Sequence, residues 1–375
     1  MPKNSFIFVE YDKHICIEKK QYTMERYCII MAGGIGSRFW PVSRPEMPKQ
    51  FLDFLGTGRT LLQTTFERYL SLFPKENIFV ATNIQYRNIV KEQIDIADEN
   101  ILCEPARKNT APCIAFATYH ISKLNPESVL VFAPCDHLIL RKEAFCAAIE
   151  KAMSFAESHK ALLTIGIKPT RPETGYGYIQ ITDDIEDGVN KVKTFTEKPN
   201  RELAEIFVES GEFFWNSGIF IWRTDVIKEA LKRHIPEITS RLDADENKFN
   251  TPEEEEFINE VFPTIPNISI DFALMEKAKN VYVLCAEFGW TDIGTWDSLY
   301  DISRKDHRGN ADLGNTLIYD SSNNIIAVKQ GKIAVVEGLE NFIIADSDDA
   351  LLICKKGDEN RLRQIFNDVN TKFKL

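Results

Sequence analysis

Apolar runs of strand length alternate with helical patterns through the first third of the chain. The runs have few polar interruptions, which is typical of strands that are buried on both faces. Between them, apolar residues recur every three or four positions, as on one face of a helix. We expect strands at 28–32, 77–81, 101–103 and 129–133, and helices at 62–73, 86–97 and from 110. This alternation predicts an α/β fold with a Rossmann-like, mainly parallel sheet flanked by helices.

From about residue 162 the pattern is mixed, and the sheet is expected to become so too. Strands are predicted at 163–167, 178–181, 192–196, 213–222 and 281–285, and helices at 201–209, 224–233, 269–278 and from 295. The acidic run 253–256 is predicted to be a solvated helix face.

Past residue 304, short strands separated by Asn, Asp, Ser and Gly predict a small all-β module. Its spacing fits a β-helix or a sandwich, and an amphipathic helix with Leu362, Ile365, Phe366 and Val369 closes the chain. We therefore expect a catalytic domain at 24–304 and a small C-terminal β domain at 305–375. Residues 1–23 are expected to be an extension outside the fold.

The composition argues against several classes of partner. A net charge of -11 over 375 residues argues against nucleic acid or an anionic membrane as the main partner. No apolar run approaches the roughly 20 residues that span a bilayer. The eight cysteines show no Cys-x-x-Cys spacing, which favours reduced thiols in a cytoplasmic protein.

The first strand runs into a loop with three glycines, Gly33, Gly34 and Gly36. Glycine lets a ligand approach the backbone closely, and a loop after a strand presents N–H groups to an anion. Arg38, Arg44 and Lys49 follow among three prolines. The alternative is a plain strand-to-loop turn, but the cations favour a polyphosphate site. The stretch is neither a P-loop nor a dinucleotide fingerprint, because Gly-Lys-Ser/Thr and a third spaced glycine are absent.

Residues 28–52 resemble the signature of sugar-1-phosphate nucleotidyltransferases, in particular the mannose-1-phosphate guanylyltransferase family. Further motifs match from residue 27 to about 300. The resemblance implies a GT-A-like nucleotidyltransferase fold, with Arg38 and Lys49 as catalytic cations. It also implies that the loop binds the nucleotide through Ala32, Gly33, Gly34, Gly36, Ser37, Arg38 and Lys49.

Two aspartates, Asp136 and Asp292, each follow a predicted strand. Alone, each would more often be a turn former or a helix cap. The resemblance places both on the metal positions of the family, and Mg²⁺ needs only one or two carboxylates beside phosphate oxygens and water.

The segment 104–112 resembles the guanine-reading motif of the family. It implies nucleotide contacts from Glu104, Asn109, Thr110 and Pro112. Lys108 stands where the family commonly has arginine, which removes the planar fork, although Arg107 beside it could compensate. From the residues alone, Thr110 is predicted to cap the helix that follows.

Three later stretches imply the sugar-phosphate site. The resemblance assigns it Gly177, Glu197, Lys198, Asn216 and Asp271. Glu197 would bind sugar hydroxyls and Lys198 the phosphate. Asp271 is also explained as a helix-cap residue.

The resemblance implies transfer of GMP from GTP to α-D-mannose 1-phosphate, giving GDP-mannose and pyrophosphate. It also implies a magnesium cofactor, a short form without the isomerase domain of longer relatives, and a homodimer formed through the C-terminal domain. Two alternatives are a related enzyme with another base or sugar, and a catalytically silent subunit that senses nucleotide sugars.

Overall fold

The computed structural model describes residues 24–329, 331–357 and 359–373. The extension predicted for residues 1–23 lies outside this range. Among the described residues, no helix is long and apolar enough to cross a membrane.

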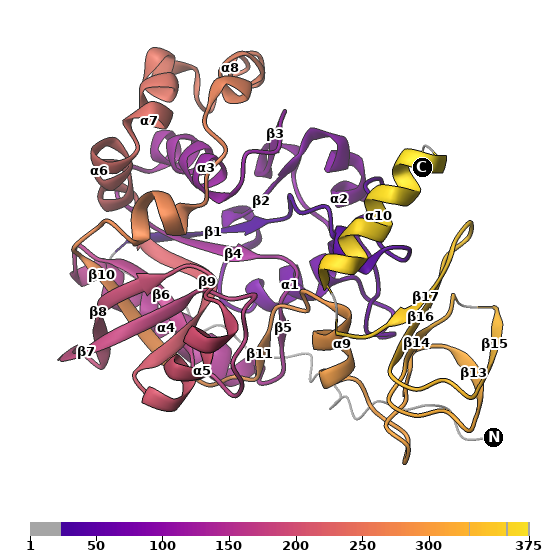
Figure 1. The fold of residues 1–375 in the computed structure, drawn as a ribbon. Helices are drawn as coiled ribbons and strands as arrows, with labels where there is room; N and C mark the ends of the chain where they lie inside the picture. Colours follow the sequence, from indigo (N-terminus) through magenta and orange to yellow (C-terminus); the bar gives the residue numbers. More distant parts are fainter. Residues whose placement is uncertain (1–23, 330, 358, 374–375) are drawn as a thin grey trace.

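A nine-stranded sheet forms the centre of the larger part of the molecule (Figure 1), in the order β3-β2-β1-β4-β9-β6-β10-β8-β7. Its strands are β1 Glu25–Met31, β2 Ile78–Asn83, β3 Ile101–Glu104, β4 Ser128–Pro134, β6 Leu162–Ile167, β7 Tyr178–Glu186, β8 Val189–Thr196, β9 Phe213–Arg223 and β10 Val281–Ala286. The first four strands pair in parallel, whereas β9 is antiparallel to β4 and β6. Strand β7 also pairs with β9, so this half of the sheet folds back on itself. The predicted mixed, mainly parallel sheet is confirmed.

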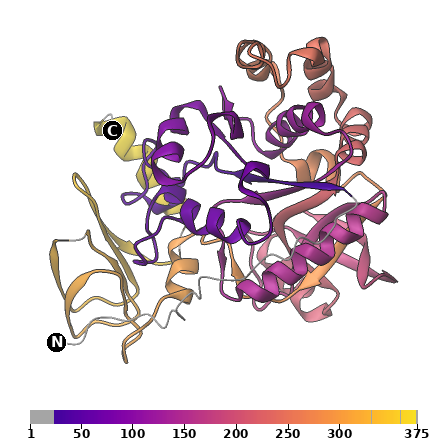
Figure 2. The same cartoon turned by 180° about the vertical axis from the view of Figure 1, so that it is seen from behind.

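Helices cover both faces of the sheet, as Figures 1 and 2 show from opposite sides. One face packs against α1 Leu61–Tyr69, α2 Arg87–Gln93, α4 Lys142–Ser158 and α5 Arg201–Ser210. The other packs against α3 Thr110–Leu124, α6 Thr224–His234, α7 Pro236–Leu242 and α8 Glu254–Val261. Alternate residues of β1 enter the two cores, with Cys28 and Ile30 in the first and Tyr27 and Ile29 in the second.

Some boundaries and contacts differ from the predictions. Helix α2 ends at Gln93, and the helix predicted over 269–278 is only a five-residue π-helix, Asp271–Met275. The acidic run is not wholly solvated, because the Glu254 carboxylate lies 2.7 Å from Nδ1 of buried His120.

The C-terminal module is built mainly from parallel strands in two small sheets. Their strands are β12 Ala311–Asp312, β13 Asn315–Tyr319, β14 Ile325–Ala327, β15 Ile333–Glu337, β16 Phe342–Asp346 and β17 Leu351–Lys355. Strands β12, β14 and β16 pair in parallel, as do β13 and β15, while β17 is antiparallel to β16. Buried Asn324 donates to the side chain of Asn310 and to the carbonyl of Leu339, which links successive turns of the chain. The parallel pairing decides for a short β-helix over a sandwich.

One hydrophobic cluster joins this module to the glycine-rich stretch and to the loop around Ile293. Phe39 and Trp40 of the glycine-rich stretch, Ile293, and Trp296 of α9 (Trp296–Ile302) pack in the same core as Ile325 and residues of β16, β17 and α10 (Glu359–Phe373). The β module therefore supports the loops that lie at the edge of the large sheet.

Candidate active site

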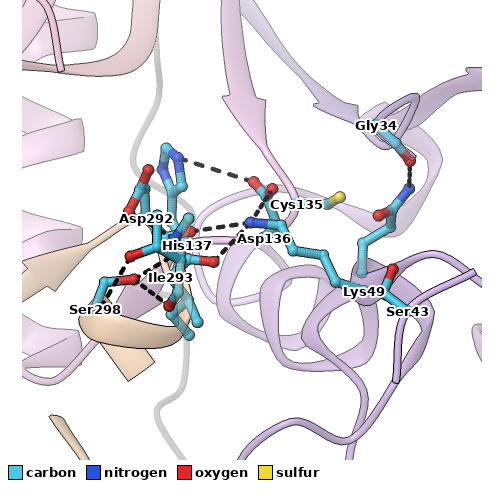
Figure 3. Close-up of polar contacts among 12 residues, drawn as sticks. Gly34, Ser43, Lys49, Cys135, Asp136, His137, Asp292, Ile293 and Ser298 are labelled. Atoms are coloured by element: carbon cyan, nitrogen blue, oxygen red, sulfur yellow. Dashed lines mark hydrogen bonds and ion pairs between the residues drawn. The ribbon is translucent and has the colours of Figure 1, made fainter. Parts of the chain in front are cut away.

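The glycine-rich loop leaves the carboxyl end of β1 and turns sharply at Gly36. Gly36 has φ +61°, and a Cβ there would lie 2.5 Å from Oγ of Ser43 and 3.0 Å from the backbone nitrogen of Lys49. Only glycine fits this conformation and this space without strain. The Gln50 amide donates to the carbonyl of Ala32 at 3.1 Å and to that of Gly34 at 2.7 Å. Figure 3 marks the bond at the Gly34 carbonyl. Gln50 thus fixes the backbone of the loop through its carbonyl groups. A Cβ at Gly34 would meet nothing within 4 Å, so there is open space beside this residue.

The Lys49 side chain joins three segments that are far apart in the sequence. Its Nζ atom lies 2.9 Å from Oδ2 of Asp136 and donates to the carbonyl oxygens of Ile293 at 2.8 Å and Asp292 at 3.3 Å (Figure 3). Burial by itself raises the pKa of Asp136, but the charge of Lys49 and its hydrogen bond to the carboxylate hold that pKa below its usual value. Asp136 is therefore a carboxylate at neutral pH.

The two aspartates are brought together by a pair of short strands. Strand β5 (Leu138–Ile139) pairs antiparallel with β11 (Trp290–Thr291), with Thr291 opposite Leu138. Asp136 comes just before β5 and Asp292 directly after β11, so both carboxylates lie at the same end of this ribbon. Trp290 Nε1 also donates to Nδ1 of His137 at 3.1 Å, and burial lowers the pKa of His137.

Asp292 is oriented by hydrogen bonds to one of its oxygens. Oδ1 accepts from the Tyr176 hydroxyl and from the Gly294 N–H, each at 2.8 Å. Ile293, between Asp292 and Gly294 in the sequence, has φ +42°, which is unfavourable for a β-branched residue, and its side chain is fully buried. Tertiary packing therefore holds this turn in place.

The two carboxylates fit a hard divalent cation. They supply oxygen ligands, and among the described residues none donates a hydrogen bond to Oδ2 of Asp292. In the same part of the chain, His, Cys, Asp and Glu form no group of three or more that could enclose a metal. Two carboxylates suit Mg²⁺, which completes its octahedron with water and phosphate oxygens.

Glu104, at the end of β3, is a buried carboxyl group that faces the glycine loop. It is 6% exposed, its Oε1 has no hydrogen-bond partner among the described residues, and Oε2 lies 3.6 Å from a Cβ placed on Gly33. Burial raises its pKa to about 7. An unpartnered buried acceptor is costly, so a ligand with N–H donors is expected to bind it.

The rest of the segment 104–112 differs in part from the predictions. The helix cap is Asn109, with φ +69°, and not Thr110, whose hydroxyl instead accepts from the backbone N–H of Ile270 at 2.9 Å. Pro112 lies in the first turn of α3. Lys108 donates to the Pro263 carbonyl at 2.7 Å.

Arg38 and Arg44 also follow the glycine loop. Arg38 is in the short 3-10 helix Ser37–Phe39, directly after Gly36. Arg44 binds Ser347 and Asp349 of the β module. The expectation that Arg44 serves the phosphate site is therefore wrong, because the β module holds its guanidinium.

The five residues predicted for the sugar phosphate form one cluster. The Asn216 amide donates to Oδ1 of Asp271 at 2.8 Å, and Lys198 Nζ lies 2.6 Å from Oε1 of Glu197. A Cβ on Gly177 would lie 3.7 Å from Asn216 Cβ and 3.9 Å from Oε2 of Glu197. Burial, and then the Glu197 charge, raise the pKa of Asp271 to about 7.

Comparison with known proteins identifies the family of the chain. The family model described as nucleotidyl transferase matches residues 27–309. The chain belongs to the nucleotidyl transferase family. The Escherichia coli O157:H7 protein named mannose-1-phosphate guanylyltransferase 2 is 40% identical over 90% of this chain and 72% of its own length. A putative mannose-1-phosphate guanylyltransferase of Vibrio cholerae is 38% identical over 90% of this chain and 73% of its own.

A solved structure supports the fold of this nucleotidyl transferase. The crystal structure of mannose-1-phosphate geranyltransferase from Thermus thermophilus has a TM-score of 0.83 at 30% identity, covering 93% of this chain and 99% of that one. The family recognised from the sequence motifs is confirmed.

The sequence predictions for this nucleotidyl transferase missed three residues that shape the site. Gln50 holds the glycine loop, Tyr176 orients Asp292, and Trp290 bonds to His137. All three lie inside or next to recognised motifs, so their position was the available signal. The contacts of Tyr176 and Trp290 each join segments more than a hundred residues apart in the sequence.

Proposed function

We propose that the protein transfers GMP from GTP to α-D-mannose 1-phosphate, producing GDP-mannose and pyrophosphate. The observation that carries the proposal is the position of Lys49. In the sequence it comes after the glycine loop, and its ammonium group lies between Asp136 and the Asp292 loop. A cation beside the Asp136 carboxylate, next to the loop that carries Asp292 and after an open glycine loop, suits a triphosphate with its divalent ion. The names of the relatives support mannose 1-phosphate as the acceptor.

Glu104 is proposed to recognise the guanine base. Guanine carries two adjacent donors, N1–H and the 2-amino group, and a carboxylate can accept from both. Adenine and the pyrimidines lack this pair. The buried Glu104 carboxyl group supports this assignment, because its Oε1 has no hydrogen-bond partner among the described residues and its Oε2 lies 3.6 Å from a Cβ placed on Gly33. Asn109 and Pro112 belong to the same segment.

The cluster of Glu197, Asn216 and Asp271 is proposed to bind the sugar hydroxyls. Asn216 is already oriented, because its Oδ1 accepts from Thr164 and from the Gly218 N–H, which leaves one amide proton for a ligand. Lys198, half-exposed beside Glu197, is proposed to bind the phosphate.

The proposed reaction is a single in-line displacement. A phosphate oxygen of mannose 1-phosphate attacks the α-phosphorus of GTP, the bond between that phosphorus and the bridging oxygen to the β-phosphate breaks, and pyrophosphate leaves with the bonding electrons. Lys49 and Arg38 stabilise charge on the α-phosphate and on the leaving group. Asp136 and Asp292 would hold Mg²⁺, which neutralises phosphate charge when bound.

Homodimer formation through the C-terminal β domain, residues 305–375, is also proposed. Strands β13 and β15 expose four apolar side chains on one small sheet: Leu317, Tyr319, Ile333 and Val335 are 53%, 53%, 76% and 64% exposed. Such a surface suits a second copy of the chain. Light scattering of an Ile333→Lys, Val335→Glu variant would test it, and an unchanged mass would contradict it.

A cytoplasmic location is proposed from the cysteines. The seven described cysteines are all free, and several are buried among apolar residues, as expected for a reducing compartment.

One assay tests the central proposal. The purified protein with Mg²⁺ is given each of four nucleoside triphosphates with several sugar 1-phosphates, and pyrophosphate release is measured. We expect turnover with GTP and mannose 1-phosphate to exceed every other pair. Equal turnover with ATP or with glucose 1-phosphate would favour a related enzyme of another specificity, and no turnover at all would favour the silent subunit.

A further inference from the structure

The base segment and the sugar cluster are physically joined. Residues 108–111 and 268–270 lie side by side and share three hydrogen bonds. The Ile268 N–H donates to the Lys108 carbonyl at 3.2 Å, the Ala111 N–H donates to the Ile268 carbonyl at 3.1 Å, and the Ile270 N–H donates to Oγ1 of Thr110 at 2.9 Å. Thr110 makes the last contact before the chain enters the sugar cluster.

The residue directly after this contact is Asp271. Ile270 is fully buried, so its backbone cannot shift freely, and the carboxylate of Asp271 accepts from Asn216 at 2.8 Å. A hydrogen bond to the Ile270 N–H therefore fixes the point from which the Asp271 side chain projects.

We infer that Thr110 is a positioning residue for the sugar-phosphate site: its hydroxyl holds Asp271 in place through the backbone of Ile270. This inference rests on the proposed function and revises the expectation that Thr110 contacts the nucleotide. It also makes the two halves of the site interdependent, because a nucleotide that orders the segment 104–112 also orders the segment that carries Asp271.

The test is a Thr110→Val variant, which keeps the size of the side chain and removes the acceptor. Losing one hydrogen bond should raise the KM for mannose 1-phosphate roughly three- to tenfold and leave the KM for GTP within about twofold. Thr110→Ser retains the hydroxyl and should restore the wild-type KM. Melting temperatures show whether each variant is folded, and the serine variant keeps the test valid if the valine variant is not.

The same helix offers a matched control. Thr118 of α3 is also buried, and its hydroxyl has no hydrogen-bond partner among the described residues. Thr118→Val should leave both KM values unchanged. A rise in the KM for GTP alone in Thr110→Val would overturn the inference, since it would mean direct contact with the nucleotide.

A double variant separates this inference from the proposed function. If Thr110 acts through Asp271, adding Thr110→Val to Asp271→Asn should raise the KM for mannose 1-phosphate no further. Fully additive effects would overturn the inference but leave the sugar site intact. An Asp271→Asn variant with unchanged KM values would instead contradict the assignment of Asp271 to the sugar site.

Discussion

The ammonium group of Lys49 lies 2.9 Å from a carboxylate oxygen of Asp136. Both side chains are largely buried, with exposed fractions of 11% and 27%. The pair keeps each charge compensated at the edge of the sheet, next to the loop that is proposed to bind the triphosphate. Lys198 instead pairs with Glu197 of the proposed sugar cluster, so the two lysines are expected to have different tasks.

Replacement of the two lysines should give different kinetic signatures. Lys49→Ala should mainly lower kcat, by about 10²- to 10³-fold, because its charge is needed as the α-phosphate becomes five-coordinate. Lys198→Ala should raise the KM for mannose 1-phosphate by roughly ten- to a hundredfold and that for GTP much less. Steady-state kinetics with each substrate varied in turn would show this. Lys91, paired with Asp98 on the surface, is a control that should change neither parameter on replacement by alanine. A Lys198→Ala variant that weakens GTP and spares the sugar phosphate would reverse the assignment.

Removal of either aspartate should abolish metal-dependent turnover. Asp136→Asn and Asp292→Asn should each lower kcat by at least about 10²-fold and weaken Mn²⁺ binding, since Mg²⁺ and Mn²⁺ prefer charged oxygen ligands. Calorimetric titration with Mn²⁺ gives a readout independent of turnover. Asp225 pairs with Arg223 at the end of β9 and is not one of the proposed metal ligands. Asp225→Asn should therefore behave as the wild type. Full activity in excess EDTA would contradict the metal site.

Glu104→Gln should change both base choice and the pH dependence of stability. The folded state raises the pKa of Glu104 from 4.5 to about 7, so between these values the folded protein binds more protons than the unfolded chain. The free energy of unfolding therefore falls as pH rises through this interval, by up to about 3 kcal/mol. Glutamine removes this loss, so the variant should gain melting temperature relative to the wild type from pH 5 to pH 8.

The same variant should lose preference for GTP over ATP by about 10- to 100-fold, because one guanine donor would then face an amide. Thermal unfolding at several pH values and turnover with both nucleotides would check the two effects. A difference in melting temperature that stays constant with pH, or an unaltered GTP preference, would contradict the role of Glu104.

Gly294→Ala should displace the carboxylate of Asp292. An added Cβ would lie 2.5 Å from Oδ2 and 3.1 Å from Oδ1 of Asp292, so the side chain must move. We expect turnover to fall by about tenfold or more with little change in melting temperature, because a misplaced ligand costs catalysis before it costs stability. Tyr176→Phe removes the hydrogen bond that Oδ1 of Asp292 accepts from the tyrosine hydroxyl. It should also lower turnover, but by less. Wild-type turnover in the alanine variant would mean that Asp292 need not be held in this orientation.

Much of the fold followed from local patterns. The alternation of apolar runs and amphipathic segments predicted the parallel strands, because strands that are buried on both faces must be apolar throughout and the helices that cover them apolar on one side. Gly33, Gly34 and Gly36 marked the loop, since glycine is required where the chain turns with positive φ and where side chains would block a ligand. Among the residues predicted for the site, Lys49 contacts Asp136 and the backbone of Asp292, and Asn216 contacts Asp271.

The sequence by itself thus determined the order of elements, the glycine loop and the family. Only the tertiary structure decided which hydrogen-bond and ion-pair partners the polar side chains have. Arg44 looked like a phosphate ligand but binds Asp349 of the β module, and Thr110 looked like a helix cap but accepts from Ile270. The parallel pairing of the C-terminal strands was equally undecided. The physical reason is shared: hydrophobic periodicity and turn chemistry act over a few residues, whereas these hydrogen bonds and pairings join segments brought together only when the cores close.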